Sequence, residues 1–337
     1  MNYNEYDIRE KARKYGFNVE TYEKQVRLID LLEEIDSNKY LHDRLALKGG
    51  TSINLFVFDG PRLSIDLDLD YTRDCSKEEM LKDREQIKKE FKKIMDKCGY
   101  VLGKKSRTSY ITDKPTFEYV DINNKNNYIK LDINYLDRCH VLPLERQKLK
   151  AKWSEKKISF QCVNTLEIFA SKIVALCDRA ALRDLYDVKQ LIEKLDLNKD
   201  NLETLHRCVV LYSCIGSKNI DKTLSGDMLR DINRYRIRTE LEPVMLEREK
   251  INLKDYLKKV EPFLDVIHNL NSREELFVEL FKEGDYRPDL VFDGEELDRI
   301  YNHPMAERKM AYYRIQQLNE DGKEIDENEQ DGPELGD

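Results

Sequence analysis

The sequence contains no run of about 18 apolar residues, the length that a membrane-spanning helix needs. Its N-terminus has no apolar signal core, so we expect a cytoplasmic protein that makes no membrane contact. The seven cysteines never occur as C-x-x-C, and the five histidines include no H-x-x-x-H pair. These absences argue against a disulfide framework, a cysteine zinc site and a histidine metal site.

Excess charge is confined to the end of the chain. The formal net charge is -8, and residues 320–337 contain nine acids and one lysine, so the rest of the chain is close to neutral. A neutral body does not by itself indicate nucleic-acid binding, although it leaves room for local basic patches. The segment 319–337 has almost no apolar residues, and we expect it to be a disordered, solubilising tail.

Strand-like patterns fill the first half of the chain and helical patterns the second. Strands are expected at 44–48, at 62–71 and within 100–137, and helices at 5–37, 51–58, 76–99 and over most of 165–318. This order predicts an α+β fold. We expect a mixed-sheet domain over 1–160, a helical domain over 161–318 and the acidic tail beyond.

One expected strand carries a column of carboxylates. In "RLSIDLDLDY", residues 62–71, Ser64, Asp66, Asp68 and Asp70 share one face, because side chains alternate along a strand. Two such charges about 4 Å apart repel by roughly 4 kcal/mol at an effective dielectric near 20. A hard divalent cation, Mg²⁺ or Mn²⁺, would offset that repulsion. The alternative is a polar strand face solvated by water.

A third acid, Asp132, lies among apolar residues in the strand pattern "YIKLDINYL". If this strand is adjacent to 62–71, Asp66, Asp68 and Asp132 could hold two metal ions. Such a pair activates a hydroxyl nucleophile and stabilises charge on the reacting and leaving phosphates. The alternative is that Asp132 simply faces solvent.

A glycine pair precedes the carboxylates. Lys48-Gly49-Gly50-Thr51 joins the strand 44–48 to the helix 51–58, for which Thr51 or Ser52 would be the cap. Glycines let a backbone approach a ligand closely, and phosphate suits a helix N-terminus. The spacing is not that of a P-loop, and a plain turn is the alternative. The glycine turn and the acidic strand, 16 residues apart, are more specific together than either alone.

Two stretches together resemble a known family. "LKGGTSINLFVFDGPRLSIDLDLD" is similar to the K-G-G-T-x-L…R-x-S-x-D-x-D signature of the AbiEii/AbiGii toxin family, within the DNA polymerase β-like nucleotidyltransferase superfamily. "NTLEIFASKIVALCDRAALRDLYDVKQL" resembles its E-x-x-x-x-K…R…R-D-x-Y-D motif, which maps to Glu167, Lys172, Arg179, Arg183, Asp184, Tyr186 and Asp187. The resemblance covers about residues 20–200. Asn54, where an apolar residue is expected, and the additional Asp70 depart from it.

The resemblance implies a polymerase β-like nucleotidyltransferase toxin of a toxin–antitoxin or phage-defence system. Such an enzyme uses Mg²⁺ or Mn²⁺ to transfer a nucleotide from a nucleoside triphosphate to an RNA acceptor, with the tRNA 3′ end as the first expectation, and releases pyrophosphate. A cognate antitoxin protein is the expected partner. Transfer to a protein hydroxyl and a non-catalytic nucleotide-binding regulator remain alternatives. The base, the acceptor and the oligomeric state are left open.

These patterns define the predicted site. The catalytic residues are Asp66, Asp68, Asp132 and Lys172, and the first three of them are also the metal ligands. The nucleotide-binding residues are Lys48, Gly49, Gly50, Thr51, Ser52, Arg62, Ser64, Arg179, Arg183, Asp184 and Asp187.

Helical geometry gives the second motif an independent interpretation. On a continuous helix at about 100° per residue, Lys172, Arg179 and Arg183 share one stripe that could clamp a triphosphate. Asp184 lies further round, unless the helix breaks near Ala180. The alternative is a solvated basic face neutralised by its own acids.

Two basic stretches are candidates for RNA contact. They are "GKKSRTS", residues 103–109, and "ERQKLKAKWSEKK", residues 145–157, which contains the only tryptophan, Trp153. Lysines and an aromatic ring could bind phosphates and stack on a base. The alternative for 145–157 is a charged, exposed helix with one buried ring.

Overall fold

The computed structural model describes residues 3–59, 62–247 and 249–320. The chain forms two compact units, which we describe separately. The first consists of the described residues of 1–138, 143–168 and 233–254, and the second of those of 139–142, 169–232 and 255–337. The two units therefore alternate along the chain, and the domain limits expected from the sequence stay predictions.

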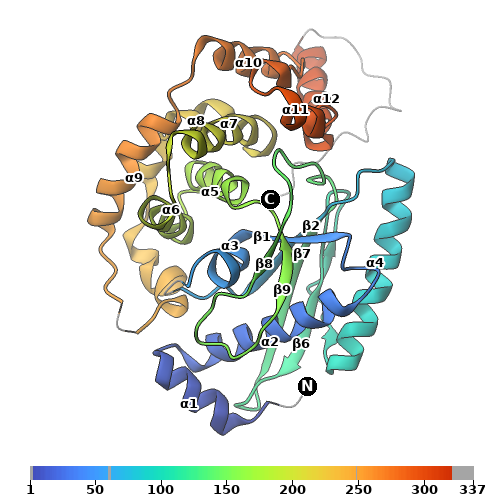
Figure 1. Ribbon diagram of the computed structural model, residues 1–337, viewed down its shortest axis with the longest axis vertical. Helices are drawn as coiled ribbons and strands as arrows, with labels where there is room; N and C mark the ends of the chain where they lie inside the picture. The colour runs from blue at the N-terminus through green and yellow to red at the C-terminus, as the bar shows by residue number, and fades with distance from the viewer. Residues whose placement is uncertain (1–2, 60–61, 248, 321–337) are drawn as a thin grey trace. The chain divides into compact units, whose positions relative to one another are not determined.

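The first unit is built on a mixed sheet that has nine strands in the described residues (Figure 1). The strands are β1 (Leu45–Lys48), β2 (Asp66–Tyr71), β3 (Val101–Leu102), β4 (Arg107–Thr108), β5 (Thr112–Lys114), β6 (Thr116–Val120), β7 (Asn126–Asn134), β8 (Glu145–Lys148) and β9 (Ser159–Cys162). The main path runs β3-β6-β7-β2-β1-β9-β8, and β5 pairs with both β4 and β7. β2 is parallel to β7 and antiparallel to β1, so the two acid-bearing strands are neighbours.

One face of this sheet is apolar and forms the core. Leu67 and Leu69 on β2 and Leu131 on β7 are fully buried. They share a cluster with Leu28 of α2 (Val19–Ser37) and Phe91 of α4 (Lys77–Cys98), the two helices that pack against this face (Figure 1). Each such side chain contributes roughly 1.5–3 kcal/mol on burial. Because side chains alternate, this burial turns the aspartates of β2 to the opposite face.

Capping residues explain where the helices of the first unit begin and end. α4 begins after Ser76, which forms a capping box with Glu79, and ends at Gly99, which has φ 79°. The prediction of a single helix over 5–37 is wrong, because this segment contains two helices. It is divided into α1 (Glu5–Tyr15) and α2, because Gly16 adopts φ 75° and the Asn18 side chain caps the start of α2.

The helix expected at 51–58 begins earlier than predicted. α3 spans Gly49–Ser52 and continues as the π-helical turn η1 (Ile53–Val57). Its N-cap is Lys48, and no side chain caps it, so the predicted caps Thr51 and Ser52 are wrong. Of the turn expected at 59–61, residues 60 and 61 lie outside the described residues.

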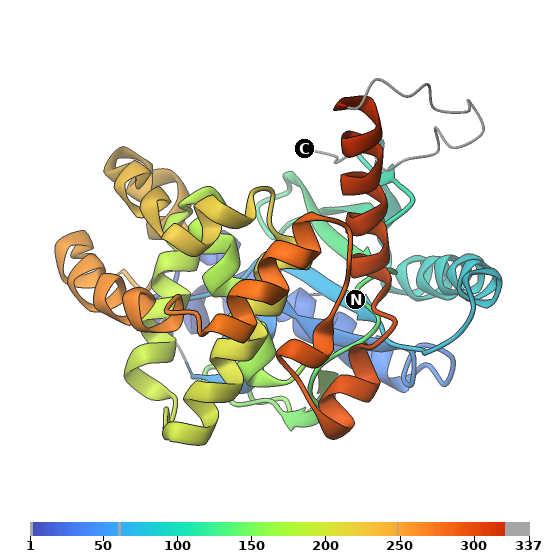
Figure 2. The same cartoon turned by 90° about the horizontal axis from the view of Figure 1, so that it is seen from above.

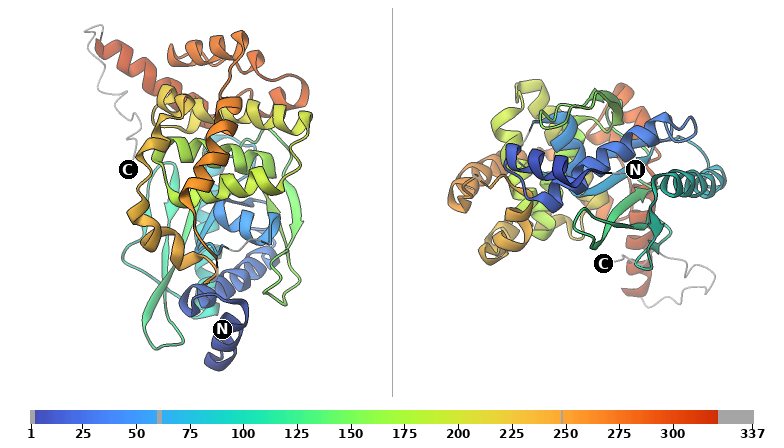
Figure 3. Two further views of the ribbon diagram at one scale, coloured as in Figure 1. Left: turned by 90° about the vertical axis from the view of Figure 1, so that its left-hand side faces the viewer. Right: turned by 90° about the horizontal axis from the view of Figure 1, so that it is seen from below.

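A hairpin joins β6 and β7 at the two Asn-Asn pairs, residues 123–124 and 126–127. β6 and β7 pair antiparallel, with Val120 opposite Asn126. Asn124 in the connecting turn has φ 59°, a left-handed conformation that asparagine adopts more readily than most residues. Figure 3 shows the sheet from two further sides. β7 is therefore held between β6 and β2.

The described residues of the second unit form helices and no strands (Figure 2). They contain most of α5 (Thr165–Arg179) and α9 (Leu253–Ile267), together with α6 (Leu182–Lys194), α7 (Lys199–Gly216), α8 (Ile220–Ser225), α10 (Ser272–Lys282), α11 (Gly294–Ile300) and α12 (Pro304–Glu320). Short helical turns complete both units: η2 (Asp227–Asp231), η3 (Arg234–Arg236), η4 (Ile237–Leu241), η5 (Glu242–Val244) and η6 (Pro288–Leu290). The predicted α+β class is thus confirmed. Except for residues 319 and 320, which end α12, the expected acidic tail lies outside the described residues.

Two expectations about environment can be compared with the fold. Among the described helices, none is both long enough and apolar enough to cross a membrane. All seven cysteines lie in the described part of the chain, and none takes part in a disulfide.

Candidate active site

The three predicted metal ligands lie on the polar face of β2 and β7. In the parallel pairing of these strands, Asp68 is opposite Asp132 and Asp66 is opposite Lys130. Paired residues point to the same face, so Asp66, Asp68 and Asp132 all face one side of the sheet. Each is partly exposed, and the strand expected to supply the third acid is indeed adjacent to β2.

The environment of Asp132 contains a cation that sequence reasoning missed. Lys114 on β5 places its Nζ 3.0 Å from Asp132 Oδ2. As their side chains are placed, the described residues include no group of three or more His, Cys, Asp or Glu that could hold a metal ion. The donor atoms available on this face are nevertheless carboxylate oxygens, the chemistry that Mg²⁺ and Mn²⁺ prefer. No sequence signal distinguishes Lys114 from other lysines.

The additional acid of β2, Asp70, has a different environment. It is 1% exposed, and Lys48 Nζ lies 2.5 Å from its Oδ1 and 3.0 Å from Asp137 Oδ2. Burial by itself would lower the pKa of Lys48, but the charges of Asp70 and Asp137 outweigh it and raise that pKa. Lys48 therefore neutralises two carboxylates in the first unit. Its role as a nucleotide ligand stays a prediction.

The glycine turn packs directly against the acidic strand. Gly49 adopts φ 68°, and a Cβ at this position would collide with the Asp68 carboxylate. A Cβ on Gly50 would lie 2.8 Å from the Arg62 guanidinium Nη2 and 3.0 Å from Ser64 Oγ. Gly49 thus requires glycine, because of both its left-handed conformation and its contact with Asp68, whereas a side chain at Gly50 would displace the Arg62 guanidinium.

The polar residues of the turn tie it to its surroundings. Thr51 Oγ1 donates a hydrogen bond of 2.5 Å to the carbonyl of Asp66. Asn54 Nδ2 donates to the Gly50 carbonyl at 2.6 Å, which explains why a polar residue stands where the resemblance expects an apolar one. Ser52 is fully buried, and the backbone N–H of Ser64 donates to Gln25 Oε1. Their roles toward a nucleotide, like that of Arg62, stay predictions.

The second motif is placed by a break in the helix. Ala180 has φ 50°, α5 ends at Arg179, and α6 begins at Leu182. The stripe expected on a continuous helix does not form, since the two helices are separate. A break near Ala180 was expected to let Asp184 face Lys172, and the two side chains are in contact.

Lys172, Asp184 and Asp187 form a buried charge cluster within the second unit, and the more exposed Arg179 pairs with it. Lys172 Nζ lies 2.8 Å from Asp184 Oδ1 and 3.1 Å from Asp187 Oδ2, and Arg179 Nε donates to Asp184 Oδ2 at 2.7 Å. Both carboxylates are 1% exposed. Burial alone would raise the pKa of Asp184, but Lys172 and Arg179 outweigh it and lower that pKa. Arg183, on α6, is half-buried, and its predicted role is untested.

The two basic stretches have different environments. Residues 145–157 form β8 and a following loop rather than a helix. Trp153 is 6% exposed, and its ring centroid lies 5.7 Å from that of Tyr22. This ring belongs to the core of the first unit and is not available to stack on RNA. Residues 103–109 form an exposed turn and the short strand β4.

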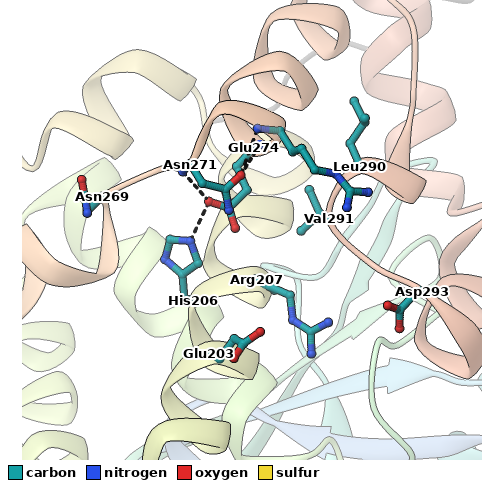
Figure 4. Close-up of a pocket in the computed structure, with 10 residues that line it drawn as sticks. Glu203, His206, Arg207, Asn269, Asn271, Glu274, Leu290, Val291 and Asp293 are labelled. Atoms are coloured by element: carbon teal, nitrogen blue, oxygen red, sulfur yellow. Dashed lines mark hydrogen bonds and ion pairs between the residues drawn. The ribbon is translucent and has the colours of Figure 1, made fainter.

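The second unit also contains a polar cavity of about 370 Å³ that sequence reasoning did not anticipate. His206 of α7 points into it toward Glu274 of α10, as Figure 4 shows. The two ring nitrogens of His206 lie 2.7 Å from the Ile267 carbonyl and 3.0 Å from Glu274 Oε2. Both neighbours are acceptors, so both bonds require the doubly protonated ring.

Replacing His206 with glutamine is expected to lower the free energy of unfolding by about 1–3 kcal/mol near pH 5.5, and by less in alkaline solution. Burial would lower the pKa of His206, but the Glu274 carboxylate outweighs it and raises that pKa. Because the pKa of His206 is higher in the folded than in the unfolded protein, its ion pair contributes its full stabilisation at pH values below about 6.5, the unfolded pKa. That stabilisation is lost as the pH rises through the pKa of His206 in the folded protein. The lowered pKa of Glu274 limits the contribution on the acid side, where it is lost as pH falls below about 4.5.

Melting temperatures of both proteins between pH 4.5 and 9 measure this effect. In a Glu274→Gln background, which keeps an acceptor but removes the charge, the effect of His206→Gln should lose most of its pH dependence. A difference in melting temperature that is the same at every pH would show that the ring is not charged.

Comparisons with known proteins agree with this architecture. The structure is similar to that of MenT4, a nucleotidyltransferase toxin from Mycobacterium tuberculosis H37Rv, with a TM-score of 0.55 and 15% sequence identity. The match covers 90% of this chain and 99% of that one. At this identity, the likeness shows a shared fold. No curated protein sequence matches the chain significantly.

A family model provides the assignment. The model described as nucleotidyl transferase AbiEii toxin, Type IV TA system, matches residues 30–277, which is well over half of the chain. The match includes the glycine turn, all three carboxylates and the charge cluster of the second unit. The chain therefore belongs to the AbiEii family of nucleotidyltransferase toxins from Type IV toxin–antitoxin systems.

Proposed function

We propose that this protein transfers a nucleotide from a nucleoside triphosphate to the 3′ end of an RNA, with tRNA as the first candidate, and releases pyrophosphate. The family supplies the class of enzyme. The observation that carries the proposal is the register of β2 and β7, which gives Asp66, Asp68 and Asp132 one common face. The cognate antitoxin is the protein partner that a Type IV system implies.

Asp66, Asp68 and Asp132 would hold Mg²⁺ or Mn²⁺. Their oxygens suit such ions, and a bound ion would neutralise phosphate charge and favour ionisation of the attacking hydroxyl. Asp132 is paired with Lys114, so binding requires this ammonium group to move away from Oδ2. Once released, Lys114 is a cation beside the reacting phosphates.

The glycine turn would position the triphosphate. Asp68 lies against Gly49, and Arg62 and Ser64 lie against Gly50, so a triphosphate held by this turn would lie beside these side chains. The carboxylates and the phosphates are then in contact with the same short turn. This arrangement favours displacement at a phosphorus close to the metal-binding face, where proximity and charge neutralisation supply most of the catalysis.

Labelled nucleotides test the proposal and identify the acceptor. Purified protein with Mg²⁺ and each of the four α-labelled nucleoside triphosphates is added to a cell lysate. We expect label in a species that RNase destroys and protease does not. Label removed by protease instead would identify a protein acceptor, and no incorporation with any nucleotide would contradict the proposed activity.

A further inference from the structure

The polar face of the sheet extends past the carboxylates along β7. Moving from Asp132 toward the start of this strand, the residues on the same face are Lys130 and Tyr128, both exposed. On β6, Glu118 is opposite Tyr128 and Val120 is 57% exposed. We name Lys130, Tyr128, Glu118 and Val120 the outer sheet face. It lies entirely within the first unit.

An exposed aromatic ring lies at the centre of this face. Tyr128 is 45% exposed, whereas its neighbours on the strand, Asn127 and Ile129, are buried on the opposite face. Lys24 Nζ, from α2, lies 4.9 Å from the ring centroid. Lys105 Nζ, from the turn between β3 and β4, lies 5.7 Å from it. The Tyr128 ring is thus presented to solvent with the exposed Lys105 and the buried Lys24 near it.

Lys24 connects this ring to the carboxylates. Burial lowers the pKa of Lys24, and the charges of Glu20, Asp66 and Glu23 oppose that shift. Lys24 is therefore within electrostatic reach of Asp66 as well as over the Tyr128 ring. Along β7, Tyr128 and Asp132 are four residues apart, or about 13 Å.

The exposed cations of the face and its aromatic ring suit one kind of ligand. Lys105 and Lys130 bring two exposed ammonium groups to Tyr128 and the strand beside it. Lys24 is 8% exposed and is balanced by Glu20, Asp66 and Glu23, and Glu118 is the acid on the outer sheet face itself. Lysines bind phosphates, and an exposed ring stacks on a base of any identity. Sheet-borne aromatic side chains recognise unstacked bases of single-stranded RNA in this way.

We propose that the outer sheet face binds the single-stranded 3′ end of the acceptor RNA, with one base stacked on Tyr128 and adjacent phosphates on the exposed Lys105 and Lys130. This inference rests on the proposed function, because the bound RNA is the acceptor of that reaction. It assigns the acceptor a definite track that leads along β7 to the carboxylates.

The test is the affinity of the whole protein for a fluorescently labelled 12-nucleotide single-stranded RNA, measured by anisotropy in EDTA without nucleotide. Tyr128→Leu should weaken binding about 5- to 150-fold, the usual effect of losing a stacking ring. Tyr128→Phe keeps the ring and should bind like the wild type. Tyr235→Leu is the matched control, because Tyr235 is 80% exposed and has Arg234 5.5 Å from its ring centroid, but lies on η3 outside the sheet.

Salt dependence tests the phosphate contacts. For single strands, the logarithm of the affinity falls with the logarithm of salt concentration by about 0.7 for each phosphate neutralised. Lys105→Gln and Lys130→Gln should each reduce the slope by about that amount. Lys92→Gln, which removes an exposed lysine of α4 that pairs with Asp96, should leave it unchanged.

The outcomes separate this inference from the proposed function. RNA binding that Tyr128→Leu weakens, in a protein that transfers no nucleotide, would support the track and refute the activity. Equal binding by Tyr128→Leu and Tyr235→Leu, or no binding by the wild type, would overturn the track. Transfer to a polypeptide that is unchanged in Tyr128→Leu would overturn it too.

Discussion

Replacing Asp68 with asparagine is expected to reduce nucleotide transfer by about 100- to 1000-fold or more and to leave the melting temperature close to that of the wild type. Asp68 lies opposite Asp132 and against Gly49, so it is the carboxylate that contacts both the neighbouring acid strand and the glycine turn. A metal ion contributes several kcal/mol of charge stabilisation in such reactions, and each 1.36 kcal/mol changes the rate about tenfold.

The fold should tolerate this change. Asp68 is only partly buried, and asparagine has almost the same shape, so the contact with Gly49 and the buried Leu67 and Leu69 on the other face are preserved. Asp70→Asn is the matched control on the same strand. Because Asp70 is buried against Lys48, this substitution should lower the melting temperature instead.

Two measurements check the Asp68 prediction. Transfer of labelled nucleotide to RNA is compared at equal protein concentration, and growth is followed after expression in a host without the antitoxin. The wild type should slow growth and Asp68→Asn should not. A well-folded Asp68→Asn protein that transfers nucleotides at the wild-type rate would eliminate the carboxylate face as the active site.

Replacing Lys172 with methionine is expected to destabilise the second unit by about 3–5 kcal/mol, the usual cost of breaking a buried ion pair. Lys172 is the ammonium partner of Asp184 and Asp187, both of which are 1% exposed. Arg179 still pairs with Asp184 in the variant, so Asp187 is the carboxylate that loses most of its charge compensation. A loss of activity in this variant would therefore not by itself identify Lys172 as a nucleotide ligand.

A second variant separates the structural role from the predicted catalytic one. Lys172→Met combined with Asp187→Asn removes the uncompensated charge and should recover part of the melting temperature. Thermal melts of both variants with and without nucleoside triphosphate and Mg²⁺ then report binding, because a ligand of the folded state raises the midpoint. If Lys172→Met alone melts like the wild type but loses the nucleotide-dependent shift, the charge cluster is not structural and the ligand role is favoured.

Local patterns in the sequence were sufficient for the α+β class and for the acidic strand. The alternation of Asp66, Asp68 and the leucines between them already required one apolar and one carboxylate face, because only one register buries the leucines. The capping box of Ser76 and the glycine at position 99 define the ends of α4 through contacts within a few residues. The two motifs and their order along the chain are sufficient to indicate the family without any long-range contact.

The partners of the charged residues were decided by the tertiary structure alone. The pairing of β5 with β7 brings Lys114 to Asp132. Asp137, in the segment after β7, reaches Lys48 on β1 across a separation along the chain that no periodicity encodes. Trp153 stands in a basic stretch that looks suited to RNA, yet its apolar ring finds Tyr22 and is buried.

The helix break at Ala180 was likewise decided by the tertiary structure. Propensity favours a continuous helix through "LCDRAALRDLYD", since alanine is the best helix former. The chain instead places Ala180 at φ 50°, which costs about 1 kcal/mol or more for a residue with a Cβ. The break lets Asp184 and Asp187 neutralise Lys172 in a buried site, and three charges that would otherwise be desolvated without partners outweigh the local preference of one residue.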